Sequence, residues 1–344
     1  MKPVSDVLPG PLRAYTTLRL GGPASTLTVV TEPGEAVATV RNAFANREPV
    51  LILAGGSNVV VVDSGFAGHV VLLRTRGVRE IERAAGAVTL RVAAGEPWDD
   101  FVAGAVADGL SGVECLSGIP GSAGATPIQN VGAYGQEVAQ TIVAVHAWDR
   151  QIGEVVTMSP AECAFGYRTS VFKHSDRWLV LEVDFRLAVS DDSAPIRYAE
   201  LARQLGAEAG DRVPLERARE TVLKLRAGKG MVLDQEDPDT WSAGSFFTNP
   251  VVDALPRAEM PHWPTDDGRF KIPAAWLIEH AGFHKGFTTG GGVAISSKHT
   301  LALTNRGDGS TDALLTLART IRDGVRARFG IELHPEPVLV GCEL

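Results

Sequence analysis

The chain has 344 residues, 44% of them hydrophobic and 22% charged, which is enough for two or three domains and apolar enough to fold throughout. Its formal net charge of −8 argues against a nucleic-acid-binding protein, which needs a basic face. No stretch approaches the roughly 20 apolar residues of a membrane span, and the N-terminus has no secretory core. We therefore expect a cytoplasmic protein without nucleic-acid or membrane partners. We also expect a monomer.

The first half of the chain predicts mainly strands. Residues 35–46 are the first predicted helix, with Val37, Val40, Ala43 and Phe44 at helical spacing. A second helix is predicted to end at Gly109, and residues 116–138 contain too much Gly and Pro for a regular element. Runs rich in β-branched residues predict strands at 50–63 (around a glycine turn), 69–73, 87–94, 141–148 and 178–188.

Helices are more frequent in the second half. Residues 215–228 predict a charged amphipathic helix, and a domain boundary is expected between about 205 and 230 from the change in composition. Pro273 and Gly282 mark the two ends of another helix. The clearest helix is 311–329, capped by Ser310 or Thr311 and ended by Gly330. Its predicted core face consists of Leu314, Ala318, Ile321, Val325 and Phe329.

Two glycine-rich segments are the main candidates for a binding site. Adjacent glycines let backbone N–H groups converge on an anion, although an ordinary hairpin turn explains the first segment equally well. Strand character continues after the first segment, which excludes a Rossmann fingerprint. Together the segments favour a bound dinucleotide. The candidate residues are Leu53, Ala54, Gly55, Gly56, Ser57 and Asn58, then Ser117, Gly118, Pro120, Gly121, Gly124, Ala125, Gln129, Asn130, Gly132, Ala133 and Tyr134.

Several single residues could carry chemistry, although each has an ordinary structural explanation. Arg168, next to Tyr167, could clamp a carboxylate or phosphate, or form a structural ion pair. Ser245 lacks the GxSxG elbow of acyl enzymes, so it is either a general acid or a turn residue. Glu336 lies between two prolines that restrict the backbone. The cysteines and histidines show no metal-ligand spacing, so no metal site is predicted.

Seven phrases, in order, resemble the UDP-N-acetylenolpyruvoylglucosamine reductase (UDP-N-acetylmuramate dehydrogenase) family. They span residues 16–341 and are TTLRLGGPA, LAGGSNVVVVDSGFAG, SGIPGSAGATPIQNVGAYGQEV, FGYRTSVFK, AGSFFTNPVV, KIPAAWLIEHAG and GIELHPEPVLVG. The resemblance implies an α+β fold with a two-part FAD-binding region of the vanillyl-alcohol-oxidase type and an inserted substrate-binding domain. The implied domains are residues 1–75, 76–228 (completed by 331–344) and 229–330.

The resemblance also implies a cofactor, a reaction and roles for the single residues. FAD would be bound non-covalently, with NADPH as co-substrate. Hydride from flavin N5 would reach the enolpyruvyl group of UDP-N-acetylglucosamine enolpyruvate. Arg168 and Glu336 would stabilise the resulting enolate, and Ser245 would supply the proton. The residues that match substrate contacts are Tyr167, Tyr198, Lys229, Asn249, Lys285 and His299.

This sequence departs from the family pattern in places, and two other functions remain open. His334 stands where the family often has Glu, and Thr248 where Lys is common. Residues 226–242 differ in length or sequence from some members. The alternatives are another FAD-dependent oxidoreductase of the same fold and a non-catalytic nucleotide-sugar-binding protein.

Overall fold

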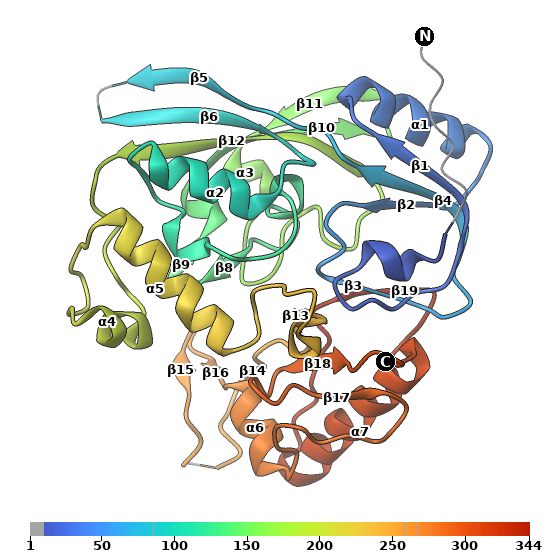
Figure 1. Cartoon of the computed structure of the whole chain (residues 1–344), viewed down its shortest axis with the longest axis vertical. Helices are drawn as coiled ribbons and strands as arrows, with labels where there is room; N and C mark the ends of the chain where they lie inside the picture. Colours follow the sequence, from blue (N-terminus) through green and yellow to red (C-terminus); the bar gives the residue numbers. More distant parts are fainter. Residues whose placement is uncertain (1–9, 85, 258, 266) are drawn as a thin grey trace. The chain divides into compact units, whose positions relative to one another are not determined.

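The computed structural model describes residues 10–84, 86–257, 259–265 and 267–344, which form two compact units (Figure 1). Unit 1 consists of Ser25–Gly55 and Ala67–Gly228 within the described part. Unit 2 consists of Gly10–Ala24, Gly56–Phe66 and Lys229–Leu344. The chain thus alternates between the units before it remains in unit 2.

Two sheets organise unit 1. The smaller sheet has the order β1-β4-β2, with β2 and β4 parallel. The larger has the path β11-β10-β12-β6-β5, with β7 paired to β12. The strand pairs along this path are antiparallel, as expected for strands joined by short turns. The bounds are β1 Ala24–Val30, β2 Val50–Leu53, β4 Phe66–Leu73, β5 Val78–Ala84, β6 Ala87–Ala93, β7 Leu110–Ser111, β10 Ile142–Asp149, β11 Glu154–Met158 and β12 Trp178–Val189.

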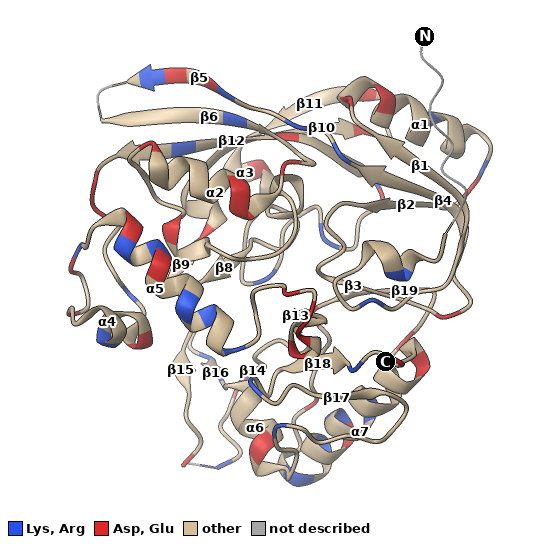
Figure 2. Ribbon diagram, viewed as in Figure 1, with Lys and Arg blue, Asp and Glu red and all other residues tan. Residues whose placement is uncertain are grey.

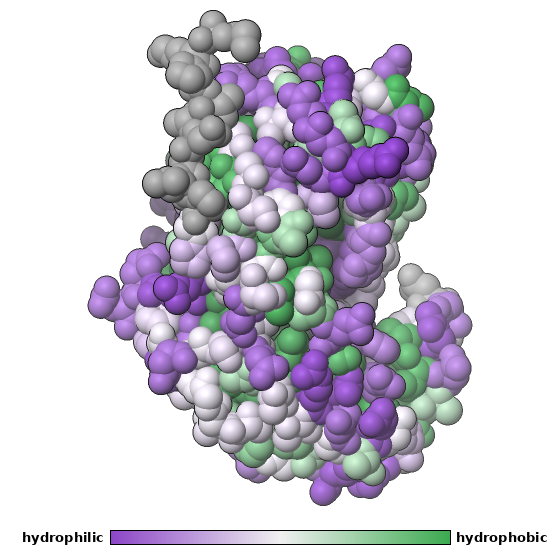
Figure 3. Space-filling model, turned by 90° about the vertical axis from the view of Figure 1, so that its right-hand side faces the viewer, coloured by the Kyte–Doolittle hydropathy of each residue, from purple (hydrophilic) through white to green (hydrophobic). Residues whose placement is uncertain are grey.

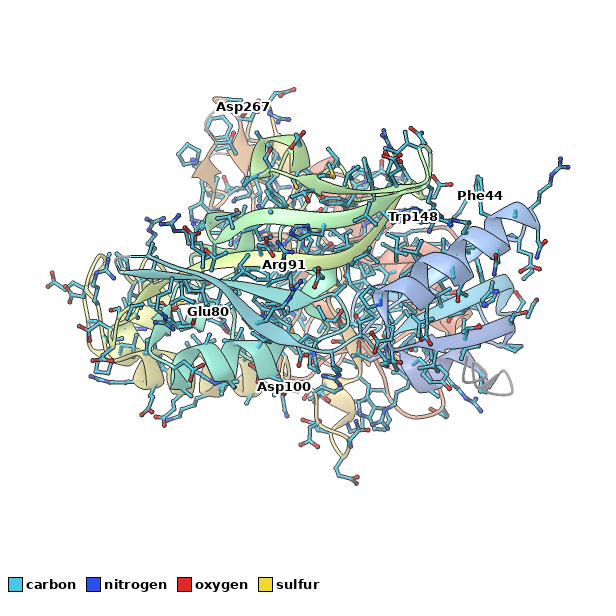
Figure 4. All side chains as sticks on the ribbon, turned by 90° about the horizontal axis from the view of Figure 1, so that it is seen from above. Phe44, Glu80, Arg91, Asp100, Trp148 and Asp267 are labelled. Carbon is cyan, nitrogen blue, oxygen red and sulfur yellow. The ribbon has the colours of Figure 1, made fainter. Side chains whose placement is uncertain are left out.

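Helices and short turns complete unit 1. The helix α1 packs its small face, Ala36, Val40 and Ala43, into the core. Phe44 was expected on that face but is 60% exposed, because it projects from the last turn of the helix into solvent (Figure 4). The remaining elements are α1 Pro33–Ala45, α2 Trp98–Ala107, α3 Pro160–Cys163, α4 Ala199–Leu205, α5 Leu215–Gly228, β8 Gly132–Ala133, β9 Gln136–Glu137, η2 Glu114–Leu116, η3 Ala123–Ala125 and η4 Val138–Gln140.

Aromatic side chains fill the centre of the unit 1 core. Trp98 and Phe101 of α2 meet Phe185 of β12, with ring centroids 5.1–5.5 Å apart. All three are almost completely buried. The indole N–H of Trp98 donates to the Leu116 carbonyl at 3.0 Å, so the same residue that fills the core also holds the start of the second glycine-rich segment.

Unit 2 packs α7 and α6 against small sheets. The order β13-β18-β17 forms one sheet and β14-β16-β15 another. A third pairing is parallel and joins β3 to β19 near the C-terminus. The bounds are η1 Leu12–Tyr15, β3 Val59–Val61, η5 Pro238–Thr240, β13 Ser242–Ser245, β14 Val251–Val252, β15 Trp263–Pro264, β16 Phe270–Lys271, α6 Ala274–His280, β17 Val293–Ile295, β18 Ala302–Asn305, α7 Thr311–Phe329 and β19 Val338–Val340.

The long helix follows the sequence prediction closely. Ser310 is its N-cap and its hydroxyl accepts the Ala313 N–H at 3.1 Å. Gly330 ends it with a φ of 70°, the left-handed conformation that glycine adopts most easily. All five residues of the predicted core face are buried. The predicted helix between Pro273 and Gly282 is also present, as α6.

Residues 331–344 were expected to complete the domain 76–228. Instead, β19 pairs with β3, residue for residue from Val338–Val59 to Val340–Val61, and both strands lie in unit 2. The Val62 N–H extends this pairing with a hydrogen bond to the Val340 carbonyl. A parallel partner this far along the sequence leaves no local signal in either strand, so spacing could not reveal it.

Candidate active site

In unit 1, the first glycine-rich segment touches the second. Leu53 ends β2, and Ala54 and Gly55 follow it. A Cβ on Gly55 would lie 2.5 Å from the Gly121 Cα, so only glycine permits this approach. Arg74 donates to the Ala54 carbonyl at 2.7 Å and holds the turn. The two segments therefore lie side by side at Gly55 and Gly121, and their binding of a dinucleotide stays a prediction.

The second segment is fixed to the connection between β6 and α2. The Gly124 N–H donates to the Ala94 carbonyl and the Ala123 N–H to the Glu96 carbonyl, both at 2.9 Å. The Trp98 N–H donates in return to the Gly121 carbonyl. These bonds hold the backbone of the segment in place without using its side chains.

A carboxylate and an arginine hold the beginning of this segment. The Gly118 N–H donates to Asp99 Oδ1 at 2.6 Å, and Arg219 of α5 binds both Asp99 oxygens, at 2.7 and 2.9 Å. Burial opposes the charge on Asp99, but the hydrogen bonds from Arg219 and Gly118 keep the pKa of this carboxyl below its usual value. The carboxylate is therefore charged at neutral pH and restrains Gly118.

Ser122 is a residue that the sequence reasoning missed. Its side chain is 4% exposed, and its Oγ has no hydrogen-bond partner in the part of the chain that the structure describes. A buried hydroxyl normally finds a partner. Its place in the phrase IPGSAG, among candidate residues, is the signal that could have found it. A polar cofactor group bound to this segment would satisfy the hydroxyl.

The β8–β9 hairpin brings Arg168 to the glycine-rich segment. Arg168 lies in a tight turn with a φ of 53°, and its Nη2 donates to the Gly132 carbonyl at 2.8 Å. Asn130 supports the same corner, because its Nδ2 donates to Glu137 at 2.9 Å and to the Gly166 carbonyl at 3.1 Å. Asn130 is thus bound to protein groups, and its part in cofactor binding stays a prediction.

Two tyrosines meet at the end of this hairpin. The rings of Tyr134 and Tyr198 are 5.4 Å apart and nearly perpendicular. A Cβ on Gly135 would lie 3.0 Å from the Arg197 Cβ, so the hairpin and the loop before α4 are in close contact. Tyr198 remains 42% exposed and Tyr167 is 40% exposed, so neither residue is buried.

In unit 2, Ser245 ends β13 beside a conformationally special glycine. Gly244 has a φ of 75°, and the pairing of β13 with β18 shifts register between Ser242 and Ser245. Ser245 is half-buried. Its Oγ makes no hydrogen bond to any other residue that the structure describes. The hydroxyl is therefore available to a bound molecule.

Glu336 is held next to Ser245 by backbone contacts. The Glu336 N–H donates to the Phe246 carbonyl at 2.9 Å, which places Glu336 beside the residue that follows Ser245. The Thr248 N–H donates to the His334 carbonyl at 3.1 Å and continues the contact. Asn58 Nδ2 approaches the Glu336 carbonyl at 3.5 Å. Unit 2 therefore brings together three residues that are far apart in the sequence and were predicted separately: Asn58, Ser245 and Glu336.

The remaining predicted substrate residues are less concentrated. Asn249 Oδ1 accepts the Ala274 N–H at 2.9 Å and so starts α6, a structural role that leaves only its Nδ2 for a ligand. Lys229 is half-buried where the chain enters unit 2, and Lys285 is exposed beyond α6. His299 lies in the turn between β17 and β18, where its N–H donates to Ser296 Oγ at 3.3 Å.

The residues predicted from the sequence belong to different units. Unit 1 holds Arg168, Tyr167 and Tyr198, and unit 2 holds Ser245, Glu336, Asn249, Lys229, Lys285 and His299. The candidate cofactor residues are also divided: Gly56, Ser57 and Asn58 belong to unit 2 and the other fourteen to unit 1. In unit 2, no side chain fits at Gly56, because a Cβ there would lie 1.9 Å from the Tyr15 carbonyl oxygen.

The described residues offer neither a metal-binding cluster nor a membrane-spanning helix. Across the described ranges, no three His, Cys, Asp or Glu side chains gather as they would around a metal ion. None of the helices in the same residues has the length and apolarity to cross a bilayer.

Comparison with known proteins gives a consistent result. The UDP-N-acetylenolpyruvoylglucosamine reductase of Salinispora arenicola is 58% identical over 99% of this chain and 98% of its own length. The chain belongs to the UDP-N-acetylenolpyruvoylglucosamine reductase family. The reductase of Streptomyces coelicolor is 54% identical, over 100% of this chain and 92% of its own.

Two domain models match separate parts of the chain. Residues 24–159 match an FAD binding domain, and residues 236–340 match the C-terminal domain of UDP-N-acetylenolpyruvoylglucosamine reductase. A crystal structure of the reductase from Thermus caldophilus superimposes with a TM-score of 0.67 at 25% identity, over 96% of this chain and 98% of that one. The predicted α+β fold with an FAD-binding region is confirmed.

Proposed function

We propose that this protein reduces UDP-N-acetylglucosamine enolpyruvate to UDP-N-acetylmuramate, with NADPH as reductant and FAD as cofactor, in peptidoglycan synthesis. The observation that carries the proposal is the 58% identity to a reductase of this name along nearly the whole of both chains. It favours this activity over a different flavin oxidase or a non-catalytic binding protein. The expected cytoplasmic location and monomeric state stay predictions from the sequence.

The residues of the glycine-rich segments fit a non-covalently bound FAD. Gly55 and Gly121 pack backbone against backbone and carry no side chains. Backbone N–H groups at such glycines can come close to a pyrophosphate. The buried Ser122 hydroxyl offers a further polar group on the same segment. When bound, FAD supplies the hydride chemistry that links NADPH to the substrate. We propose that Gly55, Gly121 and Ser122 hold it together with the candidate residues predicted from the sequence.

Ser245 is the proposed proton donor. Reduction of the enolpyruvyl double bond leaves negative charge on the carbon that carries the carboxylate, and this carbon must then gain a proton. The Ser245 hydroxyl is half-buried and makes no hydrogen bond to another described residue, so its proton can be given to a ligand. A hydroxyl is a weak acid, but an enolate carbon is a sufficiently strong base to take its proton.

Glu336 and Arg168 are proposed to stabilise the enolate. A developing oxyanion is best met by charged or hydrogen-bonding groups that are already held in place. The Glu336 backbone is fixed by its bond to Phe246, and the Arg168 side chain by its bond to Gly132. Arg168 supplies positive charge for the carboxylate, and Glu336, in its protonated form, would donate a hydrogen bond.

The nucleotide-sugar part of the substrate needs groups for a base, a sugar and a pyrophosphate. The exposed rings of Tyr167 and Tyr198 suit the flat or apolar parts. Lys229 and Lys285 suit the pyrophosphate as point charges, and Asn249 Nδ2 and His299 suit hydroxyl or carbonyl groups. These assignments rest on the resemblance and on the exposure of the side chains.

The first test is whether the flavin and the substrate are coupled. Purified protein should be yellow, and NADPH should bleach its visible absorption in the absence of oxygen. Steady NADPH consumption should then depend on the enolpyruvyl sugar nucleotide. If oxygen alone sustained turnover and the sugar nucleotide had no effect, the reductase assignment would be wrong.

Ser245→Ala tests the proton donor separately. The variant should bind FAD and bleach with NADPH like the parent, whereas product formation should fall about 10²-fold or more, the usual size of general acid catalysis. Ser64→Ala, which changes an exposed serine of unit 2, is the control and should be fully active. Near-normal product formation by Ser245→Ala would remove this serine from catalysis.

A further inference from the structure

Glu114 is a completely buried acidic residue that the mechanism above does not use. It begins η2 in unit 1, directly before the second glycine-rich segment, and its exposed fraction is 0%. Both of its carboxylate oxygens are occupied by N–H donors. No basic side chain pairs with it in the part of the chain that the structure describes. Burying such a group is costly unless its hydrogen bonds are complete.

The three donors to Glu114 come from three different segments. The Gly112 N–H donates to Oε2 at 2.6 Å, and the Ala194 N–H donates to Oε1, also at 2.6 Å. Gln136 Nε2 donates to Oε1 at 2.9 Å. Gln136 is itself buried, and its own Oε1 accepts the Cys115 N–H at 2.8 Å. The carboxylate is thus the common point of a small polar network inside an apolar cluster.

Two of these segments carry the tyrosine pair. Gln136 belongs to β9, two residues after Tyr134. Ala194 lies four residues before Tyr198, on the loop that leads to α4. Glu114 Oε1 is therefore bonded to two segments at once. One is the hairpin that carries Tyr134, and the other is the loop that carries Tyr198. The same two segments also meet through the edge-to-face contact of the two tyrosine rings, whose centroids are 5.4 Å apart.

The loop that carries Tyr198 is also held by contacts that do not involve Glu114. Ile196 is fully buried, its N–H donates to the Asp211 carbonyl at 2.8 Å, and the Ser193 N–H donates to Val213 at 2.7 Å. These contacts attach the loop to residues 211–213, not to the hairpin. Loss of the Glu114 link should therefore loosen the tyrosine pair without unfolding the loop.

We infer that Glu114 is a positioning residue for the substrate subsite, because its buried carboxylate fixes the Tyr198 loop against the Tyr134 hairpin. The inference rests on the proposed function, in which Tyr198 contacts the nucleotide-sugar. A loop held in one position binds without first having to be ordered. If this connection is weakened, only a fraction of the molecules holds Tyr198 in the position that binds substrate. The apparent affinity for the nucleotide-sugar then falls in proportion to that fraction.

Glu114→Gln is the direct test. The amide NH₂ replaces one acceptor oxygen and must face an N–H donor, so one bond of the network is lost while the size of the side chain is kept. We expect KM for the enolpyruvyl sugar nucleotide to rise about fivefold, with kcat within about twofold of the parent. FAD content and bleaching by NADPH should be unchanged. Amide hydrogen exchange should quicken in residues 190–200.

Asp149→Asn is the matched control. Asp149 is also a buried carboxylate of unit 1, at 1% exposure, and is held by Arg177 and the Gln151 N–H in the hairpin between β10 and β11. The control loses stability through the same kind of change but should keep the parent KM and the parent exchange in residues 190–200. Gln136→Leu, which removes the hairpin side of the link, should repeat the effect of Glu114→Gln.

The outcomes separate this inference from the proposed function. If the parent enzyme turns over the sugar nucleotide but Glu114→Gln shows parent KM and parent exchange, Glu114 does not position the loop. Loss of FAD and of kcat together in both Glu114→Gln and Gln136→Leu would also overturn it, because the network would then support the whole segment. A parent enzyme that does not use the sugar nucleotide would refute the function, while the exchange measurement would still test the link.

Discussion

At the scale of single residues, glycine is required in unit 1 where two backbones touch. A Cβ on Gly124 would lie 2.3 Å from the Ala94 Cβ and 2.7 Å from the Ala94 Cα, and backbone cannot move aside as the end of a flexible side chain can. Gly104 in α2 is different, because nothing lies within 4 Å of its added Cβ. Packing therefore requires glycine at position 124 but not at position 104.

Gly124→Ala should lower the free energy of unfolding by about 1–3 kcal/mol, the usual cost of overpacking. Gly104→Ala should instead raise it by up to about 1 kcal/mol, because alanine is the better helix former and restricts the unfolded chain. Urea denaturation of both variants measures the difference. Equal stability of the two variants would show that the segment can move away from Ala94.

At the scale of elements, the larger sheet of unit 1 has a polar network across its strands. Arg91 of β6 binds both oxygens of Asp184 on β12, at 2.7 and 2.8 Å. His146 of β10 lies 2.9 Å from Asp184 and 3.0 Å from Thr157 of β11. Figure 2 marks the charged positions on these strands by colour, and Figure 4 labels the Arg91 side chain. The Asp184 carboxylate thus links β6, β12 and β10, and His146 extends the network to β11.

The network should make the stability of this sheet depend on pH. Burial opposes the charge on Asp184, but hydrogen bonds from Arg91 and His146 hold its pKa below its usual value. Because the pKa is lower in the folded protein, the carboxylate adds stability above about pH 4, and this is lost as the pH falls through the folded pKa.

Asp184→Asn should therefore lower the free energy of unfolding at pH 7 by about 2–3 kcal/mol, and the gap to the parent should narrow as the pH approaches 3. Glu182→Gln on the same strand breaks the exposed pair with Arg79 and should cost less than about 1 kcal/mol. Thermal melts between pH 3 and 7 test both. A gap that stayed constant with pH would mean that the charge of Asp184 is not what stabilises the sheet.

At the scale of the whole molecule, each compact unit is assembled from separate pieces of chain. Unit 2 needs Gly10–Ala24 and Gly56–Phe66 as well as its long C-terminal part. Thr17 donates to the Ser242 carbonyl at 2.6 Å, and Asp63 accepts the N–H groups of Thr311 and Asp312 at the start of α7. Hydrophilic residues cover much of the surface seen in Figure 3.

A fragment of residues 229–344 should not fold on its own. It lacks β3, the partner of β19, and it lacks Asp63, which caps α7. Both β19 and the start of α7 would then expose backbone groups that are bonded in the full chain. The full-length protein is the control in thermal unfolding followed by circular dichroism. A cooperative transition in the fragment would show that the N-terminal pieces are dispensable.

The sequence by itself determined the local elements and the family. The period of α7, its caps and the irregular glycine-rich segment depend on residues close together in the chain. The seven ordered phrases are specific enough to indicate the reductase family without any geometry. Tertiary structure alone decided that Glu336 lies beside Phe246, that β19 joins β3, and that Ser122 and Glu114 are buried. Such contacts and such burial depend on residues many positions apart in the chain. A single sequence contains no period or spacing that predicts which distant residues will meet.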